Sequence, residues 1–217
     1  MSEVIDLQAV NASLHEQSPQ EIIKWGLSAG AKPILTTNFG PHEAAILHMV
    51  TQAAPDVPVI CVDHGYNTEA TYRFAEAIIQ RLSLKMHYYT PKVTAKRRAI
   101  VYGGIPDIED EAAHDEFTRE VKLEPFARAM AEFKPDVWLT AIRKEQTAFR
   151  DSLDVVTQDL SVGVIKVAPL FYWSELDLEE YLVEHDLPIE EDYYDPTKVL
   201  KDRECGLHVG KSIEGQT

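Results

Sequence analysis

Cysteine is scarce in this chain of 217 residues, which contains only Cys61 and Cys205. Two cysteines so far apart cannot build a disulfide framework. They also cannot supply the four thiolates of a typical iron–sulfur cluster or of a zinc site made only of cysteine. The sequence therefore excludes the disulfide-rich domains and the proteins that hold a cluster on their own cysteines.

Long apolar runs and an excess of basic residues are also missing. No stretch approaches the ~20 apolar residues that a membrane helix needs, and the acidic N-terminal stretch lacks the order of a signal peptide. The chain has 21 Lys and Arg against 36 Asp and Glu, a formal net charge of −15. Such a charge argues against general binding to nucleic acid or to anionic membranes. We therefore expect a cytoplasmic protein that binds neither, although a local basic pocket could still hold one small anion.

What the sequence does contain is an alternation of β-prone and helical segments. The spacing of Ser18 and Glu21 predicts a capped helix, and further helices are expected to begin near His42, Thr68 and Ser174. Strands are predicted over residues 33–37, 57–62, 84–89, 136–142 and 162–168. Strands separated by helices predict an α/β fold, with a mostly parallel five-stranded sheet covered by helices on both faces. No strand is expected between residues 92 and 134.

The chain divides into three parts on this interpretation. Residues 1–30 form a helical lead-in, residues 31–190 form an α/β domain, and residues 191–217 form a mobile C-terminal tail that carries Cys205. Ligands of open parallel sheets bind outside the carboxyl ends of the strands. The loops after the first, second and fourth predicted strands are therefore the places to look for a site.

The loops after the first two strands have residues typical of nucleotide contacts. The first loop includes Thr36, Thr37, Asn38, Phe39 and Gly40 before a helix, which suits a phosphate or a sulfate but lacks the Gly-Lys-Ser/Thr ending of a Walker A loop. The second loop contains Asp63 and Gly65. An ordinary strand-to-helix turn would give a similar first loop, and a turn with a helix cap would give a similar second loop.

The loop after the fourth strand gathers cations in an otherwise acidic chain. Arg143, Lys144 and Arg150 stand at or just beyond the strand end, together with Gln146. Arginine binds phosphate and sulfate oxygens in a bidentate manner, so this loop is a candidate anion site. A solvent-exposed basic loop is the alternative.

The two cysteines have different surroundings. Cys61 lies in the apolar run Val-Ile-Cys-Val and is expected in the core, whereas Cys205 lies in the polar segment Arg203-Glu204-Cys205-Gly206-Leu207-His208. A thiol with a pKa near ~8.5 is mostly protonated at neutral pH, and nearby cations lower that pKa. Arg203 and His208 could favour the thiolate of Cys205, which indicates a redox or nucleophilic role or, alternatively, an incidental thiol.

These segments, in this order, resemble the phosphoadenylyl-sulfate (PAPS) reductases. The tail motif around Cys205 is similar to the catalytic-cysteine motif of that family, and Arg143-Lys144-Glu145-Gln146 with Phe149-Arg150 is similar to its substrate segment. Thr37-Asn38-Phe39-Gly40 resembles its pyrophosphate loop, the stretch from Asp63 to Phe74 its Asp-Thr-Gly-Tyr region, and Lys166-Val167-Ala168-Pro169 its Lys-Val-x-Pro.

The resemblance implies an adenine-nucleotide α-hydrolase-like fold and a thiol mechanism. Cys205 would attack the sulfate sulfur of PAPS, and thioredoxin or glutaredoxin would release sulfite from the resulting S-sulfocysteine. Arg203 and His208 would lie near the reacting sulfur. The substrate-binding residues implied are Thr36, Thr37, Asn38, Phe39, Gly40, Asp63, Gly65, Arg143, Lys144, Gln146, Arg150 and Lys166. The family also suggests a homodimer. Related reductases that prefer adenylyl sulfate commonly hold an iron–sulfur cluster on a paired Cys-Cys and a Cys-x-x-Cys, which this chain lacks, so the cluster-free, PAPS-using branch is favoured, with no bound cofactor and no metal ligand expected.

The sequence departs from the family pattern in three places. Lys144 and Phe149 replace the usual Arg and Ser, and Pro41-His42-Glu43 adds a carboxylate near the first loop. The span from Tyr194 to Asp202 is shorter than usual, with Asp195-Pro196-Thr197-Lys198 in place of a His/Ser/Thr-rich stretch.

Three rival functions follow. A cluster-free adenylyl-sulfate reductase and a non-catalytic nucleotide-binding module stay open. An adenylating ATP pyrophosphatase would need a Ser-Gly-Gly-x-Asp-Ser loop, which this chain lacks.

Overall fold

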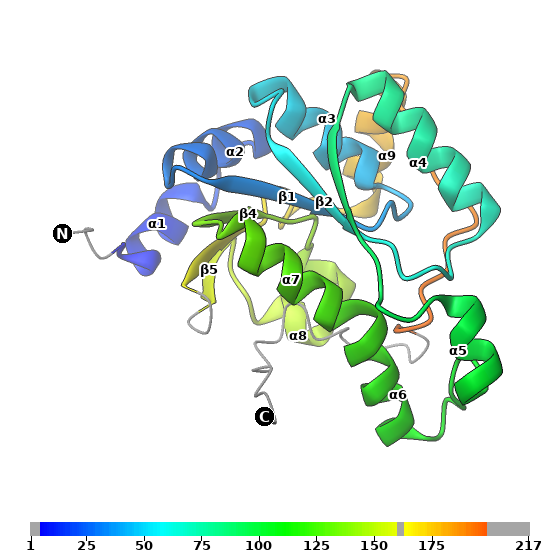
Figure 1. Cartoon of the computed structure of the whole chain (residues 1–217). Coiled ribbons are helices and arrows are strands. Elements are labelled where there is room, and N and C mark those ends of the chain that lie inside the picture. Colours follow the sequence, from blue (N-terminus) through cyan, green and yellow to red (C-terminus); the bar gives the residue numbers. More distant parts are fainter. Residues whose placement is uncertain (1–4, 160–162, 199–217) are drawn as a thin grey trace.

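A single six-stranded sheet forms the centre of the protein in the computed structural model, which describes residues 5–159 and 163–198 (Figure 1). The strand order is β3-β2-β1-β4-β6-β5. The strands are β1 (Pro33–Thr37), β2 (Pro58–Val62), β3 (Lys85–Tyr89), β4 (Val137–Leu139), β5 (Val156–Asp159) and β6 (Val164–Val167). All pairs are parallel except β5 with β6.

The two central strands are buried on both faces. Leu35 of β1 pairs in register with Val59 of β2 and with Leu139 of β4, and each of these side chains is fully buried. The neighbouring Ile34 is also buried and points to the opposite side of the sheet, since side chains alternate along a strand. Continuous apolar runs are therefore what this sheet requires, and they made the strands predictable.

Four helices cover one face of the sheet (Figure 1). They are α2 (Pro19–Ser28), α3 (Glu43–Ala53), α4 (Glu69–Leu82) and α9 (Glu175–Glu184). Three of them begin at hydroxyl caps: Ser18 accepts from the Glu21 amide, Thr68 from the Thr71 amide and Ser174 from the Asp177 amide. These three helices therefore begin where the sequence predicted, each at a side chain that caps its first turn.

The opposite face is covered by α7 (Glu124–Phe133), which packs against β2 and β3. It is preceded by α5 (Ala95–Tyr102), α6 (Glu111–Thr118) and a π-helical segment, η1 (Arg119–Leu123). Trp138 of β4 and Ile60 of β2 lie in the core cluster on this side, with Met130 of α7. Residues 92–134 thus contain helices and no strand, as expected. No helix in the described ranges combines the length and apolar character of a membrane span.

The α/β prediction is confirmed, and the strand count of five is corrected to six. The additional strand, β5, has the sequence Val-Thr-Gln-Asp and pairs antiparallel with β6 at the edge of the sheet. β4 ends at Leu139 rather than at Ile142. The chain leaves the sheet there, because the backbone amide of Ile142 turns back to the hydroxyl of Thr140 at 3.1 Å.

The lead-in residues close the β5 edge. Helix α1 (Leu7–Leu14) places Asn11 beside β5, where its amide nitrogen donates to the Val156 carbonyl at 2.9 Å and its oxygen accepts from the Val156 amide at 2.8 Å. One side chain therefore satisfies both backbone groups of this residue, as a neighbouring strand would.

Asp136 joins the starts of the two central strands. Its carboxylate accepts from the backbone amides of Ala31 and Lys32 at 2.8 and 2.7 Å, and the chain turns tightly over it at Gly30. A Cβ atom built on Gly30 would lie 2.4 Å from an Asp136 oxygen and 2.8 Å from a methyl carbon of Val137. Only glycine fits at this position without displacing the carboxylate.

Gly30→Ala is predicted to lower the free energy of unfolding by about 1–3 kcal/mol, the usual cost of overpacking a close contact. The measurement is thermal or denaturant unfolding. Gly40→Ala is the matched control, since a Cβ there meets no atom closer than 3.5 Å. Equal stability losses in the two variants would contradict this account of Gly30.

Candidate functional site

A cavity of about 260 Å³ opens at the carboxyl ends of β1, β2 and β4. It lies at the strand ends where the sequence analysis expected a site, and segments from distant parts of the sequence form its walls. The lining residues are Thr36, Thr37, Asn38, Gly40, Pro41, His42, Glu43, Ile60, Val62, Lys122, Phe126, Thr140, Ala141, Ile142, Arg143, Gln146, Arg150, Leu170, Leu178, Tyr193 and Lys198.

The loop after β1 is organised around the carboxylate of Glu43. Its Oε2 accepts from the Thr37 hydroxyl and, at 2.8 Å, from the Asn38 backbone amide. The Thr37 oxygen in turn accepts from the Phe39 amide at 3.0 Å. Phe39 adopts a left-handed backbone conformation, with φ at 54°, and buries its ring in the core. The loop therefore presents hydroxyl and amide groups to the cavity, while the Phe39 side chain points elsewhere.

The segment after β4 brings two of the predicted arginines to the cavity. Gln146, at the end of a 3₁₀ turn η2 (Lys144–Gln146), accepts through Oε1 from the Arg143 backbone amide at 3.0 Å and from the Arg150 guanidinium. Arg150 lies on α8 (Ala148–Asp151) and is buried. Gln146 thus fixes Arg143 and Arg150 on one side of the cavity.

Two other predicted cations lie away from the cavity. Lys144 extends outward, with its Nζ 3.5 Å from an oxygen of Asp151 and its side chain 44% exposed. Lys166 lies within β6, where its buried Nζ is 3.0 Å from Asp159 Oδ2 and 4.9 Å from the centre of the Trp138 ring. Lys166 therefore joins β6 to β5 and neutralises Asp159.

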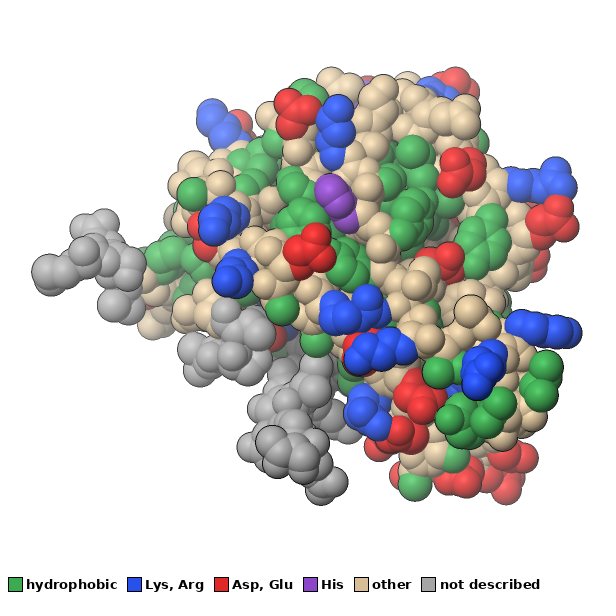
Figure 2. Space-filling model, in the orientation of Figure 1, with side chains coloured by type: hydrophobic (Ala, Val, Ile, Leu, Met, Phe, Trp, Pro, Cys, Tyr) green, Lys and Arg blue, Asp and Glu red, His purple; other side chains and the backbone are tan. Residues whose placement is uncertain are grey.

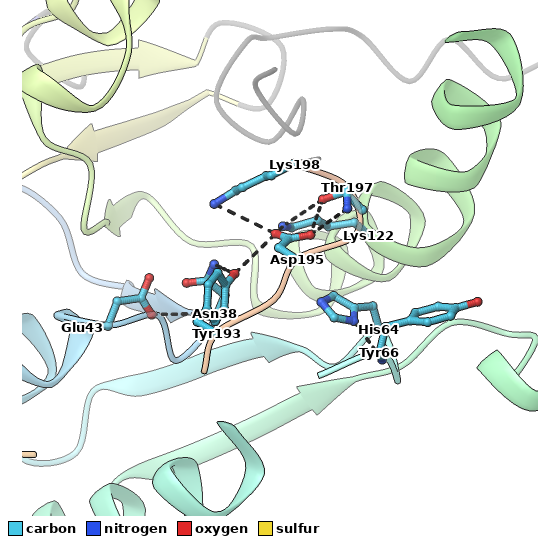
Figure 3. A network of polar contacts seen from close by, with 9 residues as sticks. All are labelled: Asn38, Glu43, His64, Tyr66, Lys122, Tyr193, Asp195, Thr197 and Lys198. Atoms are coloured by element: carbon cyan, nitrogen blue, oxygen red, sulfur yellow. Dashed lines mark hydrogen bonds and ion pairs between the residues drawn. The ribbon is translucent and has the colours of Figure 1, made fainter. Parts of the chain in front are cut away.

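Lys122 is a cavity residue that the sequence analysis missed. It comes from η1, its side chain is only 5% exposed, and its ammonium forms an ion pair with Asp195, whose carboxylate is 2% exposed (Figure 3). The same ammonium lies 3.3 Å from the Thr197 hydroxyl, and Lys198 Nζ lies 4.0 Å from Asp195. The sequence signal was weak because Lys122 ends a strongly charged stretch that is typical of a solvated surface.

Asp195 is held in its charged form by these partners. Burial alone would raise the pKa of its carboxyl, but Lys122, Lys198 and the Thr197 hydroxyl outweigh burial and hold that pKa well below its usual range. Close by, burial lowers the pKa of His64, whose Nδ1 accepts from the Tyr66 amide at 3.1 Å (Figure 3).

Residues 190–198, which include the first part of the expected C-terminal tail, lie across the cavity. Tyr193 lines the cavity and contacts the Asn38 side chain; with the amide oriented to satisfy both neighbours, Asn38 donates to Glu43 and accepts from the Tyr193 hydroxyl. The Glu190 backbone amide donates to the Pro41 carbonyl at 3.3 Å. Residues 190–198 are therefore bound to the cavity rim. Arg203, Cys205 and His208 lie outside the described residues.

Asp63 lines a second cavity, of about 230 Å³, on the other side of β2, together with Cys61, Tyr72 and Tyr88. Its carboxylate accepts from the Gly65 amide at 2.9 Å and from the Tyr72 hydroxyl at 2.7 Å. Gly65 has a positive φ of 78° and closes this turn. The structure therefore does not bring Asp63 and Gly65 together with Arg143 and Arg150 in the first cavity.

Cys61 is buried in β2 beneath this second cavity. Burial raises the pKa of its thiol, and the nearby carboxylates of Asp63 and Glu43 raise it further. A thiol held protonated in this way is a poor nucleophile, so Cys61 serves as core packing, as expected.

More basic than acidic side chains line the first cavity, although the whole chain is acidic. Arg143, Arg150, Lys122 and Lys198 line it, against one lining carboxylate, Glu43, and the adjoining Asp195. In Figure 2, several Lys and Arg side chains lie together near the middle of the face shown, next to Asp and Glu side chains, and others are spread around it. Arginine and amide donors at the carboxyl ends of parallel strands suit a phosphate or a sulfate group.

Comparison with known proteins agrees with this chemistry. The phosphoadenosine phosphosulfate reductase domain matches residues 32–195, which is most of the chain. The chain belongs to this family. The resemblance seen in the sequence motifs is thereby confirmed.

Relatives named phosphoadenosine 5'-phosphosulfate reductase also align with most of this chain. The phosphoadenosine 5'-phosphosulfate reductase of Synechococcus sp. is 35% identical over 183 residues, which is 84% of this chain and 78% of the relative. That of Photobacterium profundum is 34% identical over 194 residues, 87% of this chain and 74% of the relative.

Solved structures give the same fold. The phosphoadenylyl-sulfate reductase of Candida auris, in a phosphate complex, superposes with a TM-score of 0.75 at 28% identity, covering 87% of this chain and 91% of that one. The FMN adenylyltransferase of Candida glabrata, with a TM-score of 0.55 at 15% identity over 84% of this chain and 64% of that one, shares the fold alone.

Asp195→Ala is predicted to lower the free energy of unfolding at neutral pH by about 3–5 kcal/mol, because it removes the buried carboxylate that forms the ion pair with the Lys122 ammonium. The difference from the parent should shrink below a pH of about 4. A carboxyl whose pKa is lower in the folded state stabilises above its unfolded pKa and loses this contribution as the pH falls. Denaturant unfolding across this pH range is the measurement.

Asp56→Ala serves as the control for a surface ion pair. Asp56 lies 3.6 Å from Lys85 with its side chain 91% exposed, so its removal should cost under about 1 kcal/mol. Similar losses for Asp56→Ala and Asp195→Ala would contradict the role given to the buried pair.

Proposed function

We propose that the chain reduces 3′-phosphoadenylyl sulfate to sulfite and adenosine 3′,5′-bisphosphate through an S-sulfocysteine on Cys205. The observation that carries the proposal is the cavity at the ends of β1 and β4, where Arg143, Arg150 and Lys122 converge in a chain of net charge −15. Family membership supports the same conclusion.

Binding would use the cations and the β1 loop together. The guanidinium groups of Arg143 and Arg150 offer paired donors to phosphate and sulfate oxygens. The Lys122 ammonium adds a compact charge from η1. Glu43 now accepts from Thr37 and Asn38, so an anion seated in the loop would compete with this carboxylate for the same donors. The loop would therefore hold the anion less tightly than it would without Glu43.

Cys205 is the nucleophile in this proposal because the other cysteine cannot serve. Cys61 is buried, and burial raises the pKa of its thiol. The sequence places Arg203 and His208 within three residues of Cys205, and cations so near a thiol favour its thiolate. Arg203 and His208 would lie near the reacting sulfur and favour the thiolate of Cys205.

The first chemical step forms a bond between Cys205 Sγ and the sulfate sulfur. The bond from that sulfur to the bridging phosphate oxygen breaks, and adenosine 3′,5′-bisphosphate leaves with the electron pair. Negative charge then grows on the phosphate, where Arg143, Arg150 and Lys122 would stabilise it. The product on the protein is an S-sulfocysteine, a covalent intermediate.

The second step needs two electrons from a dithiol protein, thioredoxin or glutaredoxin. One thiolate of that protein attacks Cys205 Sγ and forms a mixed disulfide, and sulfite leaves with the electron pair of the broken S–S bond. The second thiol of the reductant then breaks the mixed disulfide. Cys205 returns to the thiol, and the reductant carries away a disulfide.

Incubation of the full chain with PAPS, without a reductant, is predicted to add one SO₃ unit to Cys205. Intact-mass analysis followed by peptide mapping measures this. Cys205→Ser should add no mass and form no sulfite with thioredoxin present, yet still bind adenosine 3′,5′-bisphosphate.

Cys61→Ala is the matched cysteine control and should keep both the adduct and sulfite formation. Sulfite production by Cys205→Ser at the parent rate would overturn the proposed nucleophile. Nucleotide binding by the parent without any adduct would favour the non-catalytic binding module instead.

The two sulfonucleotides differ only in the 3′-phosphate, and kcat/KM for the parent is predicted to be higher with PAPS than with adenylyl sulfate. The lining cations, including Lys198, outnumber the carboxylates, which favours the more anionic substrate. Steady-state sulfite formation with each substrate is the measurement. Equal or reversed preference would identify a cluster-free adenylyl-sulfate reductase.

A further inference from the structure

Three side chains that the proposed reaction does not use meet at the rim of the cavity. His42 stands at the beginning of α3, and Glu175 and Glu179 project from α9. The His42 Nε2 atom lies 3.9 Å from Glu175 Oε1 and 4.0 Å from Glu179 Oε1. The three side chains place their ligand atoms within 4.8 Å of one another.

The fold fixes this meeting from both sides. Glu175 and Glu179 are four residues apart, so they lie on one face of α9. The capping box of Ser174 and Asp177 sets the start of that helix, and α9 packs against α3. His42 occupies the N-cap position of α3, but its side chain makes no capping hydrogen bond. The imidazole is therefore available to the two carboxylates.

The charges of this cluster favour a cation. Glu175 and Glu179 repel each other at a spacing of four residues, and both face a single imidazole. Their side chains are 68% and 52% exposed, whereas that of His42 is 15% exposed. One fixed ring and two adjustable carboxylates are a donor set that imidazole-binding divalent ions, zinc above all, accept.

The distances fit an ion of this size. Zinc bonds of about 2.0–2.2 Å to nitrogen and oxygen place tetrahedral ligand atoms roughly 3.4 Å apart. The two separations from the His42 nitrogen, 3.9 and 4.0 Å, and the 4.8 Å within which all three ligand atoms lie, are longer. Small rotations of the two exposed glutamate side chains would close them.

We propose that His42, Glu175 and Glu179 bind one Zn²⁺ ion, with water in the fourth position. The ion would connect the start of α3 to α9. His42 also lines the cavity, so the ion would stand at the cavity rim. This inference concerns binding alone and does not depend on the proposed reductase activity.

A proton is the competing occupant. A protonated imidazole between two carboxylates would satisfy the same three groups without a metal. The two cases differ in how zinc binding responds when Glu179 is removed. If zinc binds at this cluster, the loss of Glu179 removes a ligand and weakens binding. If a proton occupies the cluster, any zinc bound elsewhere in the chain is unaffected by that loss.

The test titrates ZnCl₂ into the tag-free full chain carrying Cys205→Ser, so that the Cys205 thiol does not contribute. Isothermal titration calorimetry at neutral pH should give one zinc per chain. In the same Cys205→Ser chain, a second substitution, His42→Ala or Glu179→Gln, should abolish zinc binding or weaken it about tenfold or more. Loss of a residue that only supports a metal ligand already weakens metal affinity by about that factor. Co²⁺ should give the visible absorption of a tetrahedral site in the parent and not in these variants.

Glu180→Gln is the matched control, because Glu180 is an exposed neighbour on the same helix outside the cluster. It should bind zinc as the parent does. Unchanged zinc affinity in both His42→Ala and Glu179→Gln would overturn the proposal, and so would the absence of zinc binding by the parent. Thermal unfolding without metal verifies that each variant is folded.

Discussion

The buried ion pair of Lys122 and Asp195 is the contact on which the cavity depends. It joins η1, on the side of the sheet covered by α7, to the segment that follows α9. With it come the Tyr193 side chain beside the β1 loop and the Lys198 ammonium on the cavity wall. Two opposite charges removed from water must stay paired, so this ion pair helps to fix the path of residues 190–198 across the strand ends.

Much of the fold could be predicted because parallel strands leave a strong sequence signal. The apolar runs at β1 and β2 and the caps at Ser18, Thr68 and Ser174 each depend on neighbouring residues only. β5 escaped prediction because an antiparallel edge strand of sequence Val-Thr-Gln-Asp needs neither an apolar run nor a helix before it. The end of β4 was misplaced because the turn at Thr140 depends on a side-chain hydrogen bond.

The candidate site was predictable where loops follow strands and less so where it depends on tertiary contacts. Thr37, Arg143 and Arg150 reach one cavity because β1 and β4 are neighbours. Lys166 resembles a substrate-binding lysine in sequence, but Asp159 of the unpredicted β5 holds it. The ion pair of Lys122 with Asp195 joins residues more than 70 positions apart in the sequence, and so does the cluster of His42 with Glu175 and Glu179. No local sequence pattern predicts contacts over such a separation.

The amide of Asn11 has a consequence for association between molecules. An unpaired edge strand invites a strand from another chain, and proteins commonly obstruct such edges. Here a helix that precedes the sheet in the sequence supplies one side chain that fills the hydrogen-bonding positions of Val156. A chain that lost α1 would keep its cavity residues, but the backbone amide and carbonyl of Val156 at the β5 edge would then be open to pairing with a strand of another molecule.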